Sequence, residues 1–323
     1  MTIRFAQRAG LVLAALAFAA TVHAQAYPDR PIRFVIPFAA GGGSDITARL
    51  LQEPLSKELG QQVVIDNKPG AGAVLGADIV AKAKPDGYTI LYTTPGPQIT
   101  NPLLMKELPY DPVKDLVPVA PMADAINILV VHPSVPATTT KELIAYAKAN
   151  PGKLNFESSG IGSSSHLSGE LFKQQAGIEI THVPYKGTGA GIADLVAGNV
   201  QMAIDSISSL SPFIKSGQLR AIAVATLEPV PAMPGLPTIA QTLPGFDGTS
   251  INYVSVPAGT PKAVTDRLNK AFENVIKQPD VRERMIALGI VPRTSSQEVI
   301  LQRIDGERAK WKKVIEGAGS KPQ

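Results

Sequence analysis

The sequence contains no cysteine, which excludes disulfide bonds, thiol catalysis and thiolate metal sites. Charged residues make up 18% of the 323 residues, below the roughly 25% that is usual, and aromatic residues make up only 5%. The net charge is +4 and no basic run occurs, so we predict no nucleic-acid partner. With 44% hydrophobic residues, the chain can fill the cores of about two domains.

The N-terminal segment, residues 1–24, has the three parts of a secretory signal peptide. Residues 1–8 carry two arginines and no acid, residues 9–22 are apolar, and small residues stand at Val22 and Ala24. The alternative is a membrane anchor, but the apolar run is shorter than the ~20 residues that a spanning helix needs. We therefore predict cleavage after Ala24 and a periplasmic protein that does not itself insert into the membrane.

After this segment the sequence alternates apolar runs, glycine- or proline-rich loops and amphipathic segments. Residues 32–38 predict a strand, 39–45 a loop and 46–59 a helix that Pro54 should kink or break. The same order repeats along the chain, which predicts an α/β protein with mostly parallel sheets.

The length and the pattern predict two lobes with a ligand cleft between them. Residues 125–131 are long enough to cross from one lobe to the other, and residues 250–256 predict the return. Lobe 1 is then made of residues 27–127 and 251–323, and lobe 2 of residues 128–250. We expect Trp311, the single tryptophan, to be a packing residue in the last helix.

Two loops carry the clearest functional signal. Residues 38–45 (FAAGGGSD) and 158–165 (SSGIGSSS) each follow a predicted strand and open a helix. Glycine allows a ligand to approach the backbone closely, and free N–H groups at a helix N-terminus attract an anion. One such loop in each lobe would hold an anion from both sides of a cleft. The alternative is that each loop is only a flexible connection.

Two further features could contact the same ligand. Lys186 is the one cation in a third loop, residues 184–189, and its alternative is an ordinary solvated lysine. Asp205 ends a predicted strand, where it could accept a hydrogen bond from a ligand or cap the next helix. The predicted ligand-binding residues are Phe38, Ala39, Ala40, Gly41, Gly42, Gly43, Ser44, Asp45, Thr93, Thr94, Ser158, Ser159, Gly160, Gly162, Ser163, Ser164, Ser165, His166, Lys186, Gly187, Thr188 and Asp205.

Motifs for catalysis, metals and nucleotides are missing. The sequence has no G-x-S-x-G nucleophile motif and no Walker motif, and its glycine patterns near residues 70–76 and 187–191 depart from the dinucleotide fingerprint. His132, His166 and His182 do not have the spacing of a zinc site. We therefore predict no catalytic residue, no metal and no cofactor, although His166 opens a helix and could touch a ligand.

A set of short motifs, in a fixed order, points to one family. They are YPDRPIR (27–33), VIPFAAGGGSD (35–45), NKPGAG (67–72), KPDGYT (84–89), the loop at 158–165, HVPYKG (182–187), ADLVAG (193–198) and PAGTP (257–261). In this order and spacing they resemble the Bug-type substrate-binding receptors of tripartite tricarboxylate transporters. The resemblance covers nearly all of the chain after residue 26.

The resemblance implies a two-lobed periplasmic binding protein fold of type II, with each sheet flanked by helices. It implies a small carboxylate ligand, such as a dicarboxylate, a tricarboxylate, an acidic amino acid or an aromatic acid. In the family the ligand carboxylate is held by two loops that correspond here to Phe38–Asp45 and Ser158–His166. Selectivity would come from Thr93–Gln98, Lys186–Thr188 and Asp205–Ser208.

A receptor of this kind closes by a hinge and delivers its ligand to membrane permease subunits. It is not an enzyme, and we expect a monomer. Two alternatives stay open at this point: an exported carboxylate sensor that feeds a membrane signalling protein, and a secreted hydrolase. The lack of a nucleophile motif argues against the hydrolase.

Overall fold

The computed structural model describes residues 27–317. The predicted signal peptide and its cleavage site lie outside these residues. Within residues 27–317, no helix combines the length and the apolar character that crossing a membrane requires.

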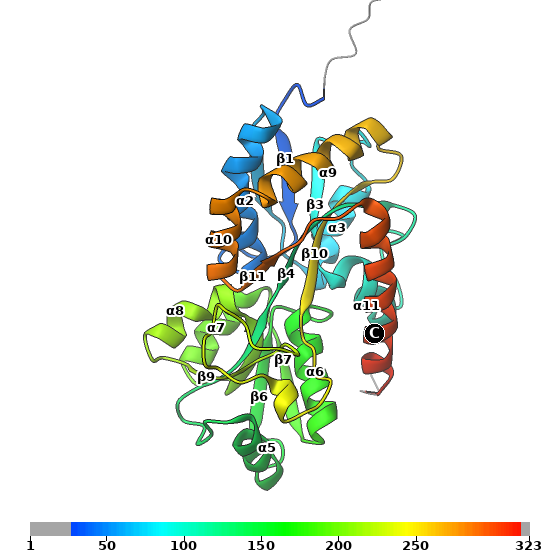
Figure 1. Ribbon diagram of the computed structural model, residues 1–323. Coiled ribbons are helices and arrows are strands. Elements are labelled where there is room, and N and C mark those ends of the chain that lie inside the picture. The colour runs from blue at the N-terminus through cyan, green and yellow to red at the C-terminus, as the bar shows by residue number, and fades with distance from the viewer. Residues whose placement is uncertain (1–26, 318–323) are drawn as a thin grey trace, which may run out of the picture.

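The structure contains two sheets, one above the other in Figure 1. The strands of the first sheet are, in spatial order, β11 (Ile290–Pro292), β4 (Leu116–Ala125), β10 (Ser250–Pro257), β3 (Thr89–Thr93), β1 (Ile32–Ile36) and β2 (Val63–Asn67). Those of the second are β7 (Ile180–Pro184), β6 (Leu154–Ser158), β8 (Met202–Ser206), β5 (Asn127–Val131) and β9 (Arg220–Val224).

Both sheets are mixed, which refines the expectation of mostly parallel sheets. In the first, β2, β1 and β3 are parallel, whereas β10, β4 and β11 pair in antiparallel fashion. In the second, β7, β6 and β8 are parallel, and β5 runs antiparallel to β8 and β9. The antiparallel strands lie next to the points where the chain crosses from one sheet to the other. Parallel neighbours need a crossover connection, usually a helix, and a chain that passes directly between the sheets has none there.

Helices flank both sheets, as the α/β class requires. Around the first sheet lie α2 (Gly43–Leu59), α3 (Val74–Ala81), α4 (Asn101–Leu104), α9 (Lys262–Ile276) and α10 (Pro279–Ala287), with the short turns η1 (Ala71–Ala73) and η2 (Gly96–Thr100). Around the second lie α5 (Thr140–Ala149), α6 (Ser164–Ala176), α7 (Thr188–Val196), α8 (Ile207–Lys215) and the turn η3 (Ile239–Gln241). The last helix, α11 (Gln297–Gly317), runs alongside both sheets in Figure 1.

Local sequence signals explain where several helices begin and end. α2 runs unbroken through Pro54, contrary to the break that we considered, and ends at Gly60, which takes the left-handed conformation. The hydroxyl of Thr139 caps α5 by accepting a hydrogen bond from the Glu142 N–H at 3.1 Å.

The chain passes between the sheets where the sequence suggested. β4 ends at Ala125 and β5 begins at Asn127, so Ile126 links the two sheets. The return follows at β10, which begins at Ser250 and pairs along its length with β4. We keep the names lobe 1 and lobe 2, with the residue boundaries given above, as a working proposal.

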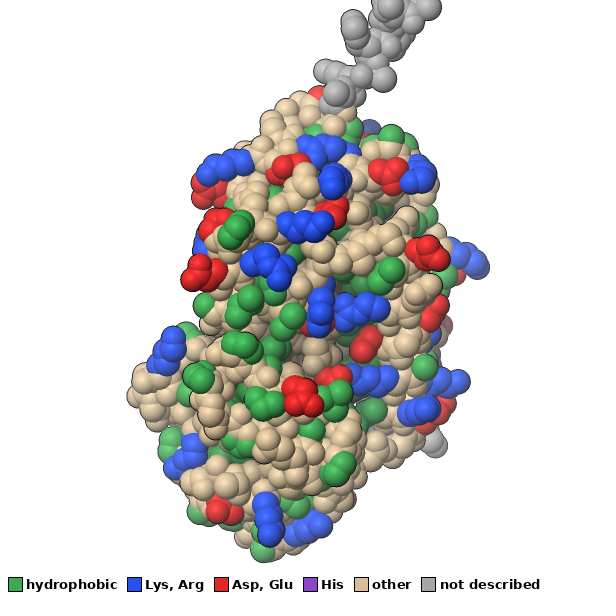
Figure 2. Space-filling model, in the orientation of Figure 1, with side chains coloured by type: hydrophobic (Ala, Val, Ile, Leu, Met, Phe, Trp, Pro, Cys, Tyr) green, Lys and Arg blue, Asp and Glu red, His purple; other side chains and the backbone are tan. Residues whose placement is uncertain are grey.

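The helix α11 ties the lobes together. Its Ile304, Trp311 and Val314 belong to the same buried cluster as Phe156 and Phe172 of the second sheet and its helix α6. Trp311 is fully buried, as expected of a packing residue, and its indole N–H donates to Glu307 at 2.7 Å. On the face seen in Figure 2, hydrophobic side chains gather at the waist between the lobes, while charges of both signs are spread over both lobes.

Candidate functional site

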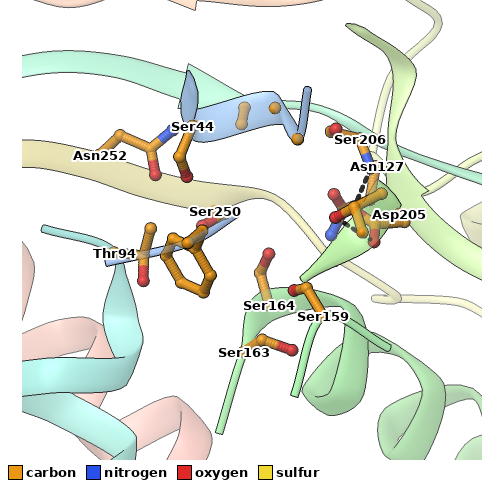
Figure 3. A pocket seen from close by; sticks show the side chains of 15 residues that line it. Ser44, Thr94, Asn127, Ser159, Ser163, Ser164, Asp205, Ser206, Ser250 and Asn252 are labelled. Carbon is orange, nitrogen blue, oxygen red and sulfur yellow. Dashed lines mark hydrogen bonds between the residues drawn. The ribbon is translucent and has the colours of Figure 1, made fainter. Parts of the chain in front are cut away.

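A small cavity of about 40 Å³ lies where the two sheets meet. Its lining residues are Phe38, Gly42, Gly43, Ser44, Thr94, Ala125, Asn127, Ser159, Ser163, Ser164, Thr188, Asp205, Ser206, Ser250 and Asn252. Figure 3 shows Ser44, Thr94 and Asn252 on one side, Ser159, Ser163 and Ser164 below, and Asn127, Asp205 and Ser206 beyond them. No lysine or arginine is among the described residues that line it.

Four helices begin at this cavity. α2 begins at Gly43, α6 at Ser164, α7 at Thr188 and α8 directly after Ser206, and all four of these residues line the space. No side chain caps α2, α7 or α8. The first N–H of α8, at Ile207, donates to the Ile126 carbonyl at 3.0 Å, whereas no side chain takes up the first N–H groups of α2 and α7. Helix N-termini carry partial positive charge, so the cavity attracts an anion without a side-chain cation.

The first loop, residues 38–45, which we call loop 1, is braced by a buried carboxylate. Asp45 accepts hydrogen bonds from the Gly41 N–H at 3.0 Å, Arg49 Nε at 2.9 Å and Asn67 Nδ2 at 3.0 Å. Burial alone would raise the pKa of Asp45, but these bonds outweigh it and hold the pKa below its usual value. Asp45 therefore supports the loop from behind and does not line the cavity.

The second loop, residues 158–166, which we call loop 2, is braced by neutral groups. Ser163 Oγ accepts from the His166 N–H and donates to the Gly160 carbonyl at 2.6 Å, while Ser165 Oγ accepts from the Ser159 N–H at 3.0 Å. Behind the loop, the His166 ring stacks on His182 with ring centroids 4.2 Å apart. His166 Nδ1 accepts from the Gly162 N–H at 3.2 Å.

Burial keeps both histidine rings neutral. It lowers the pKa of His166 to about 4, and together with the neighbouring His166 it lowers the pKa of His182 to about 3. Ser158 Oγ and His182 Nε2 are 2.6 Å apart, but Ser158 is fully buried and does not line the cavity. This serine–histidine pair therefore supports loop 2 and is not placed to attack a substrate.

Asp205 stands in the cavity wall, in front of a second buried acid. Its oxygens accept from the Ser206 N–H at 2.6 Å and from the Thr188 hydroxyl at 2.9 Å. Behind it lies Glu157, fully buried, whose oxygens have no hydrogen-bond partner of standard geometry. Burial, and then the charge of Asp205, raise the pKa of Glu157 well above its usual value, so Glu157 keeps its proton at neutral pH.

A second cavity of about 240 Å³ adjoins the first, because Phe38 and Ser159 line both. It is lined on one side by Gly70–Ala73 and on the other by Ile161, Tyr185 and Lys186. The turn at Gly70–Ala73 is strained, since the non-glycine residues Ala71 and Ala73 have φ of 47° and 76°. Lys186 is the one cation among the described residues that line either cavity.

The lobes touch on both sides of the first cavity. The Thr100 hydroxyl donates to the Gly162 carbonyl at 2.7 Å, and a Cβ at Gly43 would collide with Ser206 Oγ of the opposite lobe. A Cβ at Gly187 would lie 3.0 Å from the Cβ of Ala39, so the third loop, residues 184–189, meets loop 1. This is the arrangement of two lobes closed on each other.

The structure brings together about half of the predicted ligand-binding residues. Those that line the first cavity are Phe38, Gly42, Gly43, Ser44, Thr94, Ser159, Ser163, Ser164, Thr188 and Asp205, and the second cavity adds Gly160 and Lys186. Those that line neither are Ala39, Ala40, Gly41, Asp45, Thr93, Ser158, Gly162, Ser165, His166 and Gly187. The second set belongs to the same loops but shapes or braces them from behind.

Four residues that line the cavity were not predicted from the sequence. Ala125 and Asn127 flank the first crossing between sheets, and Ser250 and Asn252 begin the return strand. The only signal in the sequence was that residues 125–131 and 250–256 would join the lobes. Connecting strands of a two-lobed fold lie at the base of the cleft. Their polar residues could therefore have been predicted to line the cavity.

The comparisons with known proteins agree with this architecture. The family model described as tripartite tricarboxylate transporter family receptor matches residues 47–320. The chain is 35% identical to Protein BugT of Bordetella pertussis (strain Tohama I), covering 97% of this chain and 96% of BugT. It is 39% identical to the UPF0065 protein in the tcbD-tcbE intergenic region of Pseudomonas sp. (strain P51), covering 94% and 93%.

Solved structures are similar over almost the whole chain. The R. palustris protein Rpa4515 with adipate has a TM-score of 0.89 at 37% identity, covering 92% of this chain and all of that one. The periplasmic binding protein BugD has a TM-score of 0.87 at 35% identity, with the same coverage. MatC from Rhodopseudomonas palustris with bound malate has a TM-score of 0.84 at 33% identity, covering 90% of this chain and 100% of MatC.

Proposed function

The chain belongs to the receptor family of tripartite tricarboxylate transporters, a family of binding proteins and not of enzymes, and we propose that it captures a small carboxylate by closing its lobes around it. Its similar structures include periplasmic binding proteins, and two of them hold adipate and malate. Because this family is not enzymatic, the secreted-hydrolase alternative is rejected.

One observation carries the proposal: four helices begin at a cavity that no described lysine or arginine lines. The uncapped N–H groups at the starts of α2 and α7, with the hydroxyls of Ser44, Ser163 and Ser164, offer donors to a carboxylate. The helix dipoles add favourable potential where water is largely excluded. The donors have fixed positions that match the two oxygen atoms of one carboxylate group. Such a site would therefore select a carboxylate by its geometry.

The second cavity suits the rest of an elongated ligand. An acid anchored in the first cavity would extend past Phe38 toward Lys186, which could pair with a second carboxylate. Lys186 is exposed, so we expect it to adjust affinity by a modest factor and not to decide whether binding occurs.

A ligand that contacts both lobes binds the closed form more tightly than the open form. This difference in affinity shifts the equilibrium between the two forms toward the closed one. We propose that the closed form delivers the ligand to the permease subunits of a tripartite tricarboxylate transporter, from the periplasm and as a monomer. The alternative role, presentation to a membrane signalling protein, uses the same closed form.

A thermal-shift screen, followed by calorimetric titration of each hit, tests the proposal. The panel contains C4–C6 diacids, citrate, acidic amino acids, nicotinate and benzoates, with the corresponding neutral amides as controls. At one hundred times Kd a ligand stabilises the native state by about 2.7 kcal/mol, which a melting curve detects. We expect a dose-dependent shift with an acid, none with its amide, and no chemical change in the acid. The screen is repeated on protein that has been unfolded and refolded to remove any carried-over ligand. The proposal fails if no acid then raises the melting temperature.

A further inference from the structure

The base of the first cavity contains a buried acceptor with no partner. Asn127 is 1% exposed and stands at the first position of β5. Its Nδ2 donates to the Gly248 carbonyl at 3.0 Å and to Ser168 Oγ at 3.2 Å. A carbonyl can only accept, so the amide nitrogen must face Gly248, and Oδ1 is left without a hydrogen bond although the residue lines the cavity.

Two other acceptors line the same cavity. Asp205, which lies near Asn127 in Figure 3, uses its oxygens for the Ser206 N–H and the Thr188 hydroxyl but keeps further lone pairs. Asn252 Oδ1, on the return strand, is also buried without a partner. The cavity thus offers buried acceptors as well as donors, and a bare carboxylate, which can only accept, satisfies only the donors.

Building on the proposed function, we propose that the preferred ligand carries a hydrogen-bond donor, a hydroxyl or an ammonium group, a few bonds from its anchored carboxylate, and that Asn127 Oδ1 accepts from it. The cavity is small, so a donor that reaches its base must be close to the carboxylate bound at the helix N-termini. The ligand class is therefore the 2-hydroxy or 2-amino carboxylates. An acid with hydrogen alone at that carbon leaves Oδ1 buried and unpaired.

Sets of three acids that differ at one group test this inference. We compare succinate, malate and aspartate; glutarate, 2-hydroxyglutarate and glutamate; adipate, 2-hydroxyadipate and 2-aminoadipate; and 3-phenylpropionate, phenyllactate and phenylalanine. In the set that fits, we expect the hydroxy or amino acid to bind about tenfold more tightly than the unsubstituted acid, because an unpaired buried acceptor is penalised by about that factor or more. Which of the two binds better identifies the donor.

The outcomes separate this inference from the proposed function. If an unsubstituted acid binds as tightly as its hydroxy and amino partners, a water molecule pairs with Asn127 Oδ1, and the inference is wrong while the carboxylate receptor stands. If none of the twelve acids binds, nor any acid of the larger panel, the proposed function itself fails.

Two variants assign the effect to Asn127. Asn127→Leu removes the acceptor, so the tenfold preference for the hydroxy or amino acid over the unsubstituted acid should fall to about one. Ser168→Ala is the matched control, since it removes one partner of Nδ2 but leaves Oδ1 unpaired, and should keep the preference. A preference that survives Asn127→Leu would overturn the role of Asn127. If that variant does not fold, the acid comparison with the unaltered protein still decides.

Discussion

Loop 1, residues 38–45, and loop 2, residues 158–166, reach the same cavity from opposite lobes with different chemistry. Loop 1 presents glycine backbone at an uncapped helix and is held by the ionised Asp45. Loop 2 presents serine hydroxyls and is held by a neutral network that ends in the stacked pair His166 and His182. Loop 1 should therefore be sensitive to added steric bulk, and loop 2 to protonation of its histidines.

Of these changes, a fall in pH should lower the free energy of unfolding most, through the histidines that support loop 2. Unfolded histidine has a pKa near 6.5, whereas folding lowers it to about 4 in His166 and about 3 in His182. Below pH 6.5 the unfolded chain therefore takes up protons that the folded protein does not, so stability present above pH 6.5 is lost as pH falls toward 4. Between pH 7 and pH 5 we expect a loss of about 3 kcal/mol in the free energy of unfolding, measured by urea denaturation.

The double variant His166→Asn with His182→Gln is the control for this pH effect. Each substitute can keep a polar atom near the ring nitrogen that bonds Gly162 or Ser158, but neither titrates in this range. The loss between pH 7 and pH 5 should shrink to about 1 kcal/mol or less, the scale of the remaining groups. An unchanged slope would show that the histidine pair is not its source.

The next largest effect is steric and belongs to loop 1. In Gly43→Ala, the new Cβ would collide with Ser206 of the opposite lobe, so the closed form is penalised while each lobe still folds. Overpacking of this kind costs about 1–3 kcal/mol, which corresponds to a ten- to hundredfold weaker affinity by calorimetric titration. Gly42→Ala is the matched control, since a Cβ there has its nearest neighbours at 3.6–3.8 Å and its φ is −79°. Equal losses in both variants would contradict this explanation.

A smaller effect should follow from removing the brace of loop 1. Asp45→Asn leaves an amide whose single oxygen cannot satisfy the three donors of Gly41, Arg49 and Asn67. We expect about 2 kcal/mol less stability at pH 7, because hydrogen bonds to a buried charged group are lost. The difference in stability between the variant and the unaltered protein should become smaller in acid. There the unaltered protein protonates Asp45, whose pKa folding lowers, and loses the same charged hydrogen bonds. A deficit that does not change with pH would argue that shape, not charge, is what Asp45 supplies.

The smallest effect should come from the cap of loop 2. Ser163→Ala removes the acceptor for the His166 N–H and the donor to Gly160. Loss of a helix cap costs about 1 kcal/mol. The melting temperature should fall slightly, and Ser164→Ala, which leaves the cap intact, should not lower it. If both variants melt alike, the cap contributes nothing measurable.

Much of the site could be read from local sequence patterns, because loops 1 and 2 are each a continuous strand–loop–helix unit. Position within the loop was harder to predict. Asp45 and His166 belong to these segments but face away from the cavity, since the direction of a side chain at a helix start depends on what packs behind it. The antiparallel strand β4 was not predicted, because Pro118 and Pro121 interrupt the pattern of a typical strand.

The α/β alternation, the two strand–loop–helix units of loops 1 and 2 and the membership of a receptor family follow from the amino-acid sequence alone, since all of these depend on neighbours along the chain. That Asn127, Ser250 and Asn252 line the same cavity as Asp205 depends on the tertiary structure. Those residues come from segments far apart in the sequence that meet at the base of the cleft. The acceptors that would choose among carboxylates therefore become visible only once both lobes are packed.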